Sequence, residues 1–161
     1  MKVIFLDRDG IINKERGYYT WKLEDFKFVN GLWENLMLFQ KQGFKFIVIT
    51  NQGGIAREIY SHTDVYLIHN YMREQFKKHN IELLDVFYSP YHSIISKSLS
   101  RKPDSLMFEK AIALYNVNRE QSVMIGDSER DIIAANKAGI SGVLVNSNQN
   151  LSEIKSKIIN E

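Results

Sequence analysis

Short apolar runs alternate along the chain with longer segments whose apolar residues recur every three or four positions. The short, largely apolar runs predict buried strands, over residues 3–6, 44–49, 84–88, 122–125 and 142–145. The helical periodicity predicts amphipathic helices, over residues 31–42, 63–79, 105–115, 129–138 and 151–159. Strands that alternate with helices predict an α/β fold, a doubly wound, Rossmann-like parallel sheet with helices on both faces.

Two helix boundaries carry signals of their own. Gly43 follows the first predicted helix and is a plausible stop for it. Asp104 follows Pro103 and is the expected N-cap of the helix that starts at residue 105. The length of 161 residues predicts one domain over residues 1–161.

Composition narrows the classes of protein to consider. The chain has no cysteine, which excludes disulfides, thiolate nucleophiles and cysteine-based zinc sites. A net charge of +2, with no basic stripe of interleaved aromatics, predicts no nucleic-acid partner. The apolar runs are too short to span a membrane, and Met1-Lys2 leads directly into a strand with no room for a signal peptide. We therefore expect a cytoplasmic protein, without a membrane partner, and a monomer.

Polar residues that could carry chemistry follow the predicted strands. Asp7 and Asp9 come after the first apolar run, Thr50 after the second and Asp127 after the fourth. Ligands of open parallel sheets gather at the carboxyl ends of the strands, so these side chains are expected at one edge. Taken singly, each aspartate is more often a turn residue or helix cap, and Lys102 more often a solvated charge. Together, the ordered set favours phosphoryl transfer.

The ordered set resembles the haloacid dehalogenase superfamily of phosphatases. The segments Phe-Leu-Asp-Arg-Asp-Gly at 5–10, Thr50, Arg-Lys-Pro at 101–103 and Gly-Asp at 126–127 carry the resemblance, which spans about residues 3–145. The two intervals between these motifs have room for a flap, helices and loops but for no extra domain. The resemblance therefore implies a capless member with an open active site.

This resemblance implies a role for each residue. Asp7 is the expected nucleophile, forming an aspartyl-phosphate, and Asp9 the general acid and base. Thr50 is expected to donate a hydrogen bond to the phosphoryl group, and Lys102 to neutralise its charge. Mg²⁺, a hard cation that prefers oxygen ligands, is the expected cofactor. The ligands that the resemblance implies are Asp7, the main-chain carbonyl of Asp9, and Asp127, with Asp131 either supporting the metal through water or holding a loop.

Several stretches resemble a narrower group, the bacterial heptose 1,7-bisphosphate phosphatases, with histidinol-phosphate phosphatases close by. Residues 5–13 and 101–103 match both groups, whereas 17–18 and 50–57 resemble the heptose group more. The implied substrate contacts are Glu15, Arg16, Gly17, Tyr18, Asn51, Gln52, Gly53 and Arg101. Two alternatives stay open: Asn51 and Gln52 could instead satisfy loop backbone, and Tyr18 could pack within the flap.

The sequence departs from this group at two places. Its members usually carry a zinc loop of three cysteines and a histidine before Arg-Lys-Pro. In residues 89–100, serine stands at the apparent cysteine positions and Tyr91 at the apparent histidine position, so no structural zinc is expected. Relatives also often place a basic residue directly after the metal-binding aspartate, where this chain has Ser128. This second departure puts the substrate in doubt.

The leading hypothesis is a Mg²⁺-dependent phosphatase that releases the 7-phosphate of D-glycero-D-manno-heptose 1,7-bisphosphate, a phosphorylated sugar, in nucleotide-heptose synthesis for lipopolysaccharide, capsule or glycoprotein surface layers. One alternative is the same chemistry on histidinol phosphate or another small phosphate monoester. Another is a non-catalytic binding domain, against which the five intact motif residues argue.

Overall fold

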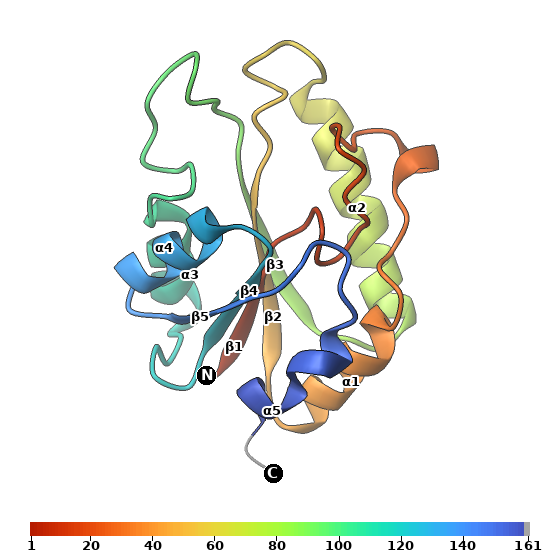
Figure 1. The fold of residues 1–161 in the computed structure, drawn as a ribbon, viewed down its shortest axis with the longest axis vertical. Coiled ribbons are helices and arrows are strands. Elements are labelled where there is room, and N and C mark those ends of the chain that lie inside the picture. Colours follow the sequence, from red (N-terminus) through yellow and green to blue (C-terminus); the bar gives the residue numbers. More distant parts are fainter. Residues whose placement is uncertain (160–161) are drawn as a thin grey trace.

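The computed structural model describes residues 1–159, and a five-stranded parallel sheet lies at its centre (Figure 1). The strands are β1 (Val3–Leu6), β2 (Lys45–Asn51), β3 (Leu83–Ser89), β4 (Val123–Gly126) and β5 (Ser141–Leu144). Their order is β3-β2-β1-β4-β5, and every neighbouring pair is parallel. The predicted doubly wound sheet is confirmed, with its switch of direction between β1 and β4.

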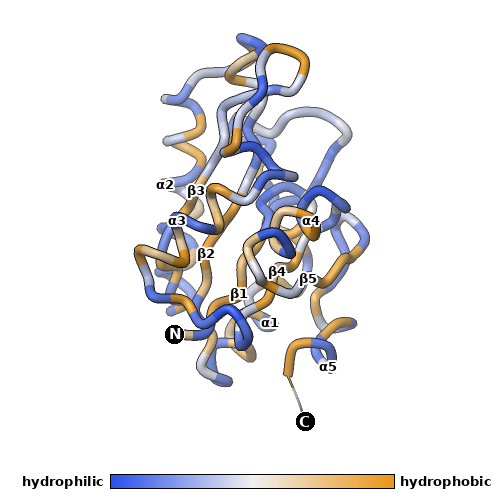
Figure 2. The backbone as a smooth tube through the Cα atoms, turned by 90° about the vertical axis from the view of Figure 1, so that its left-hand side faces the viewer, coloured by the Kyte–Doolittle hydropathy of each residue, from blue (hydrophilic) through white to orange (hydrophobic). Residues whose placement is uncertain are grey.

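Helices cover both faces of the sheet, as Figure 1 shows. They are η1 (Leu23–Asp25), α1 (Leu32–Lys41), α2 (His62–Lys78), α3 (Leu106–Tyr115), α4 (Glu129–Lys137), η2 (Leu151–Ile154) and α5 (Lys155–Ile158). Alternate residues of β1 face opposite layers. Ile4 and Leu6 belong to the core that includes α1 and α2, whereas Val3 and Phe5 belong to the core under α3 and α4. In Figure 2, where orange marks hydrophobic residues, the central strands run as largely orange segments through the middle of the molecule.

Three details of the predicted elements change. Asp104 does not cap α3, because Ser105 is the N-cap and Asp104 instead pairs with Lys137 at 2.8 Å. The predicted final helix is divided between η2 and α5. Strand β2 runs on to Asn51, so Thr50 lies inside the strand and not beyond it. The predicted stop at Gly43 is supported by its left-handed backbone, with φ at 86°.

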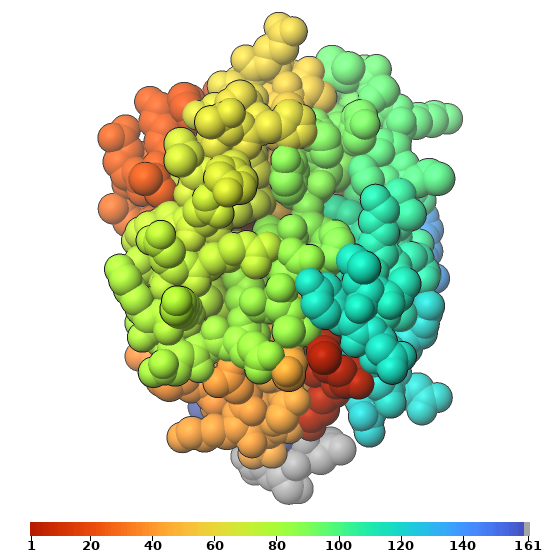
Figure 3. Space-filling view, turned by 180° about the vertical axis from the view of Figure 1, so that it is seen from behind, coloured from red at the N-terminus to blue at the C-terminus, as the bar shows by residue number. Residues whose placement is uncertain are grey.

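The loops at the carboxyl ends of the strands lie together at one end of the molecule (Figure 1). They are residues 7–31 after β1, 52–61 after β2, and 90–105 after β3. Figure 3 shows the green segment that follows β3 at the upper edge of the molecule, beside the yellow segment that leads into α2. Among residues 1–159, no helix has the length and apolar character needed to cross a membrane.

Candidate active site

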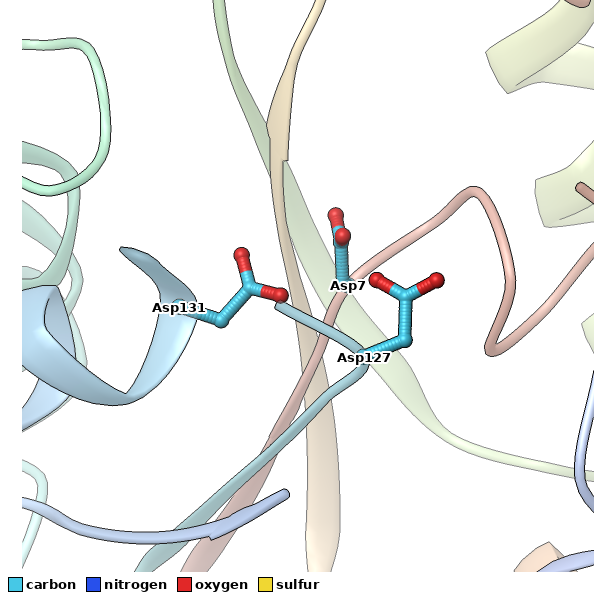
Figure 4. Close-up of side chains that lie close together, drawn as sticks. All are labelled: Asp7, Asp127 and Asp131. Atoms are coloured by element: carbon cyan, nitrogen blue, oxygen red, sulfur yellow. The ribbon is translucent and has the colours of Figure 1, made fainter. Parts of the chain in front are cut away.

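Three carboxylates from separate segments converge at the switch point of the sheet (Figure 4). Asp7 directly follows β1, and its N–H extends the ladder by donating to the Ile125 carbonyl at 3.1 Å. Asp127 directly follows β4, and Asp131 lies in the first turn of α4. Each offers a carboxylate oxygen within 4.8 Å of the others. Fold topology thus places three negative charges in one small volume.

Lys102 reaches this cluster from the loop before α3. Its Nζ atom lies 2.9 Å from Asp7 Oδ1 and donates to the Ile49 carbonyl at 2.8 Å. It also lies 2.7 Å from Asp131 Oδ1, an ion pair without hydrogen-bond alignment. The side chain is only 1% exposed. Lys102 is therefore a buried counter-charge and not a solvated surface lysine.

The backbone of Lys102 is fastened to the end of β2 by Asn51. The Asn51 side chain accepts from the Lys102 N–H and donates to the Lys102 carbonyl, each at 3.0 Å. This pair of hydrogen bonds joins positions 51 residues apart. Asn51 borders the cavity described below, yet its amide is engaged in holding the loop. The alternative that Asn51 satisfies loop backbone therefore has direct structural support.

The electrostatics of the cluster show an excess of negative charge. Burial, followed by the charge of Asp131, raises the pKa of Asp7 to about 7, although Lys102 opposes the shift. Burial likewise raises the pKa of Asp127, with Asp131 adding to it. Burial alone would lower the pKa of Lys102, but Asp7 and Asp131 outweigh it and raise the pKa. One lysine thus faces three carboxylates.

The residues present fit a divalent cation such as Mg²⁺. The donors are all carboxylate oxygens, which Mg²⁺ prefers. Asp131 Oδ1 is buried, and its 2.7 Å contact with Lys102 Nζ lacks hydrogen-bond alignment. A further positive charge would relieve the repulsion between the carboxylates. Asp7, Asp127 and Asp131 are the side chains that could hold it.

Two glycines allow this close approach. Gly10 has a φ of 86°, and a Cβ atom there would lie 2.0 Å from Asp127 Oδ2. A Cβ atom on Gly126 would lie 2.5 Å from Asp131 Oδ2. Any larger residue would push a carboxylate out of the cluster. Packing against the carboxylates therefore requires glycine in the Asp-Gly and Gly-Asp motifs.

Asp9 lies beside the cluster but is held by a different set of donors. Its Oδ1 accepts from Arg8 Nη2 at 2.9 Å and from Asn13 Nδ2 at 3.0 Å, and its Oδ2 accepts from Gln52 Nε2 at 3.1 Å. Burial opposes ionisation, but the Arg8 charge and these hydrogen bonds outweigh it and lower the pKa of Asp9. The two aspartates of the first motif thus have opposite shifts in pKa.

Gln52 links Asp9 to two further residues. Its Nε2 also donates to Thr50 Oγ1 at 2.9 Å, and its Oε1 accepts from Tyr60 Oη at 2.7 Å. Gln52 is 2% exposed and Thr50 1% exposed. Both predicted site residues are therefore present beside Asp9, and in this structure Thr50 accepts a hydrogen bond from Gln52.

A cavity of about 540 Å³ opens over the carboxylates. Predicted site residues border it as follows: Asp7, Asp9, Glu15, Gly17, Tyr18, Asn51, Gln52, Lys102 and Asp127. Sequence reasoning did not assign the remaining bordering residues to the site, apart from its remark on Ser128: Tyr19, Thr20, Arg57, Ser128, Arg130 and Ser147. Of these, Arg57 ends the stretch 50–57 and Arg130 follows the Gly-Asp motif at 126–127. A positive charge close to a motif was therefore the sequence signal that could have assigned them to the site.

Five predicted residues do not border this cavity, and one of them is Asp131, which is buried in the carboxylate cluster. Thr50 is buried behind Gln52, and Arg16 pairs with Asp25 at 2.6 Å. Arg101 donates to the Tyr91 carbonyl at 2.8 Å and borders a neighbouring cavity of about 600 Å³. Gly53 packs next to Arg101, whose Nη1 would lie 3.0 Å from a Cβ atom there.

Serine hydroxyls hold the loop between β3 and α3. Ser100 Oγ lies 3.0 Å from Ser89 Oγ and 2.8 Å from Ser98 Oγ. Ser89 is fully buried at the end of β3. The three serines that stand at the apparent cysteine positions thus form one hydrogen-bonded group, and this group immediately precedes Arg101 and Lys102.

Comparisons with known proteins agree with this geometry. The family model for HAD-hydrolase-like proteins matches residues 99–159. The D-glycero-alpha-D-manno-heptose-1,7-bisphosphate 7-phosphatase of Photorhabdus laumondii is 36% identical over 146 residues, covering 87% of this chain and 79% of the relative. The D-glycero-beta-D-manno-heptose-1,7-bisphosphate 7-phosphatase of Helicobacter pylori is 38% identical over 144 residues, covering 89% and 83%.

A solved structure is also similar. The D,D-heptose 1,7-bisphosphate phosphatase of B. bronchiseptica, complexed with magnesium and phosphate, is 26% identical with a TM-score of 0.84, covering 95% of this chain and 87% of that one. Sequence identity above 30% over most of the chain, the shared fold and the ordered motifs lead to one conclusion. The chain belongs to the heptose-1,7-bisphosphate 7-phosphatase family, phosphoric monoester hydrolases of the haloacid dehalogenase superfamily.

Proposed function

We propose that this protein is a Mg²⁺-dependent phosphatase that releases the 7-phosphate of D-glycero-D-manno-heptose 1,7-bisphosphate through an aspartyl-phosphate. The observation that carries the proposal is the position of the Asp7 carboxylate. It borders an open cavity, lies 2.9 Å from Lys102 Nζ, and shares a cluster with Asp127 and Asp131. The names of the relatives supply the substrate class.

The first chemical step follows from the hydrogen bonds of Asp7. Its Oδ1 accepts from the Arg8 N–H at 2.8 Å and from Lys102 Nζ at 2.9 Å. These donors orient the carboxylate so that Oδ2 is the oxygen that attacks phosphorus. The bond from phosphorus to the leaving sugar oxygen breaks as that oxygen takes a proton from Asp9. The lowered pKa of Asp9 belongs to the substrate-free protein; the negative charge of a bound phosphate raises this pKa, so that Asp9 carries the proton in the complex. Bound Mg²⁺ would supply positive charge that shields the nucleophile from the anionic substrate.

The second step returns the enzyme to its starting state. Asp9 takes a proton from a water molecule, whose oxygen attacks phosphorus, and the bond from phosphorus to Asp7 breaks to release inorganic phosphate. Lys102 stabilises negative charge on the transferring oxygens in both steps. Three donors hold the Asp9 carboxylate, which keeps it directed at the cavity.

Aromatic residues in the cavity lining suit a sugar. Tyr18 is 59% exposed and lies edge-on to Tyr19, with ring centroids 5.5 Å apart. Arg57 Nη1 donates to Tyr19 Oη at 3.1 Å, which steadies this part of the lining. An exposed aromatic with a polar neighbour can contact both the apolar and the hydroxyl-bearing faces of a sugar. The relatives include enzymes named for the alpha and for the beta anomer, so both anomers belong in the test.

The test is phosphate release with Mg²⁺ from both anomers of heptose 1,7-bisphosphate and from histidinol phosphate, with Asp7→Asn as the blank. Rapid release from one heptose anomer is the expected result, and that anomer indicates the pathway. Weak and equal release from all three compounds would reject the heptose substrate while retaining the phosphatase chemistry. Release by Asp7→Asn equal to that of the wild type would reject Asp7 as the nucleophile.

A further inference from the structure

The arginines of this chain fall into two groups. Four of the seven pair with a carboxylate: Arg8 with Asp9, Arg16 with Asp25, Arg73 with Asp85, and Arg119 with Glu109. The other three have no carboxylate partner within residues 1–159, and all three border the active-site cavity or the cavity beside it: Arg57, Arg101 and Arg130. Among residues 1–159, the arginines without a carboxylate partner are thus all located where an anionic substrate would enter.

Arg130 has the most informative position of the three. Together with Lys102, it is one of the two residues that border both cavities. Lys102 is buried and already paired with Asp7 and Asp131, which leaves Arg130 as the exposed cation at the boundary. Its guanidinium is engaged by no hydrogen bond or ion pair in the part of the chain that the structure describes.

Helix stability does not explain an arginine at this position. Arg130 is the second residue of α4, which starts at Glu129. A cation in the first turn of a helix is unfavourable, because the helix dipole places partial positive charge there. Glu129 and Asp131 on either side follow the favourable pattern, and Asp131 completes a capping box with Ser128. Arg130 is the exception in this turn, which points to a role outside the helix.

The neighbouring cavity has the size and charge to take an anionic group. Its volume is about 600 Å³, and Lys97, Arg101 and Arg130 border it, with Asp104 as the acidic residue. Asp104 is neutralised by Lys137 at 2.8 Å. The positive charges of Arg101, Arg57 and Arg130 all act on His92 in the loop after β3. Together with burial, which is the larger cause, they lower the pKa of His92.

We infer that Arg130 binds the second, non-reacting phosphate of a bisphosphorylated sugar and thereby selects such substrates over monophosphates. This inference rests on the proposed function, since it assumes that the reacting phosphate sits against Asp7. A guanidinium at the boundary can donate two parallel hydrogen bonds to a phosphate in the second cavity. The neighbouring wall position, Ser128, carries no charge, so Arg130 supplies the cation in this turn.

The test compares heptose 1,7-bisphosphate with heptose 7-phosphate, which lacks only the non-reacting phosphate. Arg130→Gln should raise KM for the bisphosphate about 10- to 100-fold, the range of a lost charge-assisted hydrogen bond. It should leave kcat and the KM for the monophosphate within about twofold. Arg130→Lys should recover part of the loss. Ser128→Lys added to Arg130→Gln should also recover part, because it returns a charge to the same wall.

Arg73→Gln is the control, because it removes a partly exposed arginine that borders neither cavity. It should change neither KM. An equal effect of Arg130→Gln on both substrates, or no effect on either, would overturn the inference.

Calorimetric titration of the Asp7→Asn protein with sugar mono- and bisphosphates separates this inference from the proposed substrate. Suppose that the heptose compounds are not hydrolysed, but the Asp7→Asn protein binds bisphosphates more tightly than monophosphates and loses this preference when Arg130→Gln is added. The role of Arg130 would then be retained although the proposed substrate is rejected. If the Asp7→Asn protein shows no preference for bisphosphates, the role of Arg130 is rejected.

Discussion

The Nζ atom of Lys102 lies 2.9 Å from Oδ1 of Asp7, although 95 positions separate the two residues in the chain. Asp7 follows the central strand β1, whereas Lys102 comes from the loop after the edge strand β3. The side chain therefore crosses beneath the end of β2, where the Ile49 carbonyl accepts its second hydrogen bond. The contact joins the loop before α3 to the centre of the sheet.

Lys102→Met should abolish most activity and weaken the fold when divalent metal is absent. The variant leaves the Asp7 and Asp131 carboxylates buried without their counter-charge, a change that typically costs about 3–5 kcal/mol. Urea denaturation with and without Mg²⁺ measures the loss, and added Mg²⁺ should restore part of the stability. Equal stability of variant and wild type in a chelator would contradict the role of Lys102 as counter-charge.

Asp7→Asn should stop turnover and leave the protein folded. The amide cannot attack phosphorus as a carboxylate does, and it removes one of three clustered negative charges. We expect phosphate release to fall at least about 1,000-fold and the melting temperature in a chelator to stay the same or rise. Circular dichroism and a thermal scan provide the check. A collapsed thermal transition would show that Asp7 is needed mainly for folding.

Removal of divalent metal should stop catalysis without unfolding the protein. Both cores are built from apolar side chains and include none of the three carboxylates. Bound metal at 100 times its Kd would add only about 2.7 kcal/mol of stability by mass action. Phosphate release and a thermal scan, each with and without chelator, test this. Unfolding of the protein in chelator at room temperature would instead indicate a structural metal. Asp127→Asn should weaken the activation of phosphate release by Mg²⁺.

His69 should make the protein less stable as the pH falls below neutrality. Burial and then the Arg8 charge lower the pKa of His69 to about 3, and Arg8 Nη1 lies 3.4 Å from its Nε2. The unfolded chain takes up this proton near pH 6.5 while the folded chain does not. The contribution of His69 is therefore intact above pH 6.5 and falls toward pH 3 by up to about 1.4 kcal/mol per pH unit.

The measurement is the free energy of unfolding between pH 7.5 and 5 for wild type and His69→Gln, since the histidine effect shows as the difference between them. Asp7 acts in the opposite direction: its raised pKa, about 7, favours the folded state as the pH falls. Repeating both measurements in the Asp7→Asn background removes that contribution. Parallel pH profiles for the two proteins would exclude His69 as the cause.

Ser100→Ala should loosen the loop that carries Arg101 and Lys102. It removes the partner of Ser98 and leaves the buried Ser89 hydroxyl without the 3.0 Å contact, at a typical cost of about 1–3 kcal/mol. Urea denaturation and hydrogen exchange of residues 90–101 provide the measurement. Ser96→Ala, an exposed serine in the same loop, is the control and should change neither. Identical exchange in both variants would show that the serine group does not hold the loop.

Local patterns along the chain were enough to predict the fold and the edge of the sheet where the site lies. Strand and helix periodicity reports which residues are buried, and parallel strands bring their carboxyl ends to one edge, so Asp7 and Asp127 were predictable neighbours. The ordered motifs also identified the family that the comparisons show. These features depend on local patterns along the chain.

Which polar side chains meet depends on how distant segments fold against one another. Asp131 joins the carboxylate cluster because the turn after Gly126 brings α4 back over β4. Arg16 pairs with Asp25 because the segment 7–31 folds back on itself. Arg101 and Arg130 border a second cavity whose shape depends on the path of the loop after β3. Loop paths depend on contacts between distant segments, and such contacts leave no periodic signal in the sequence.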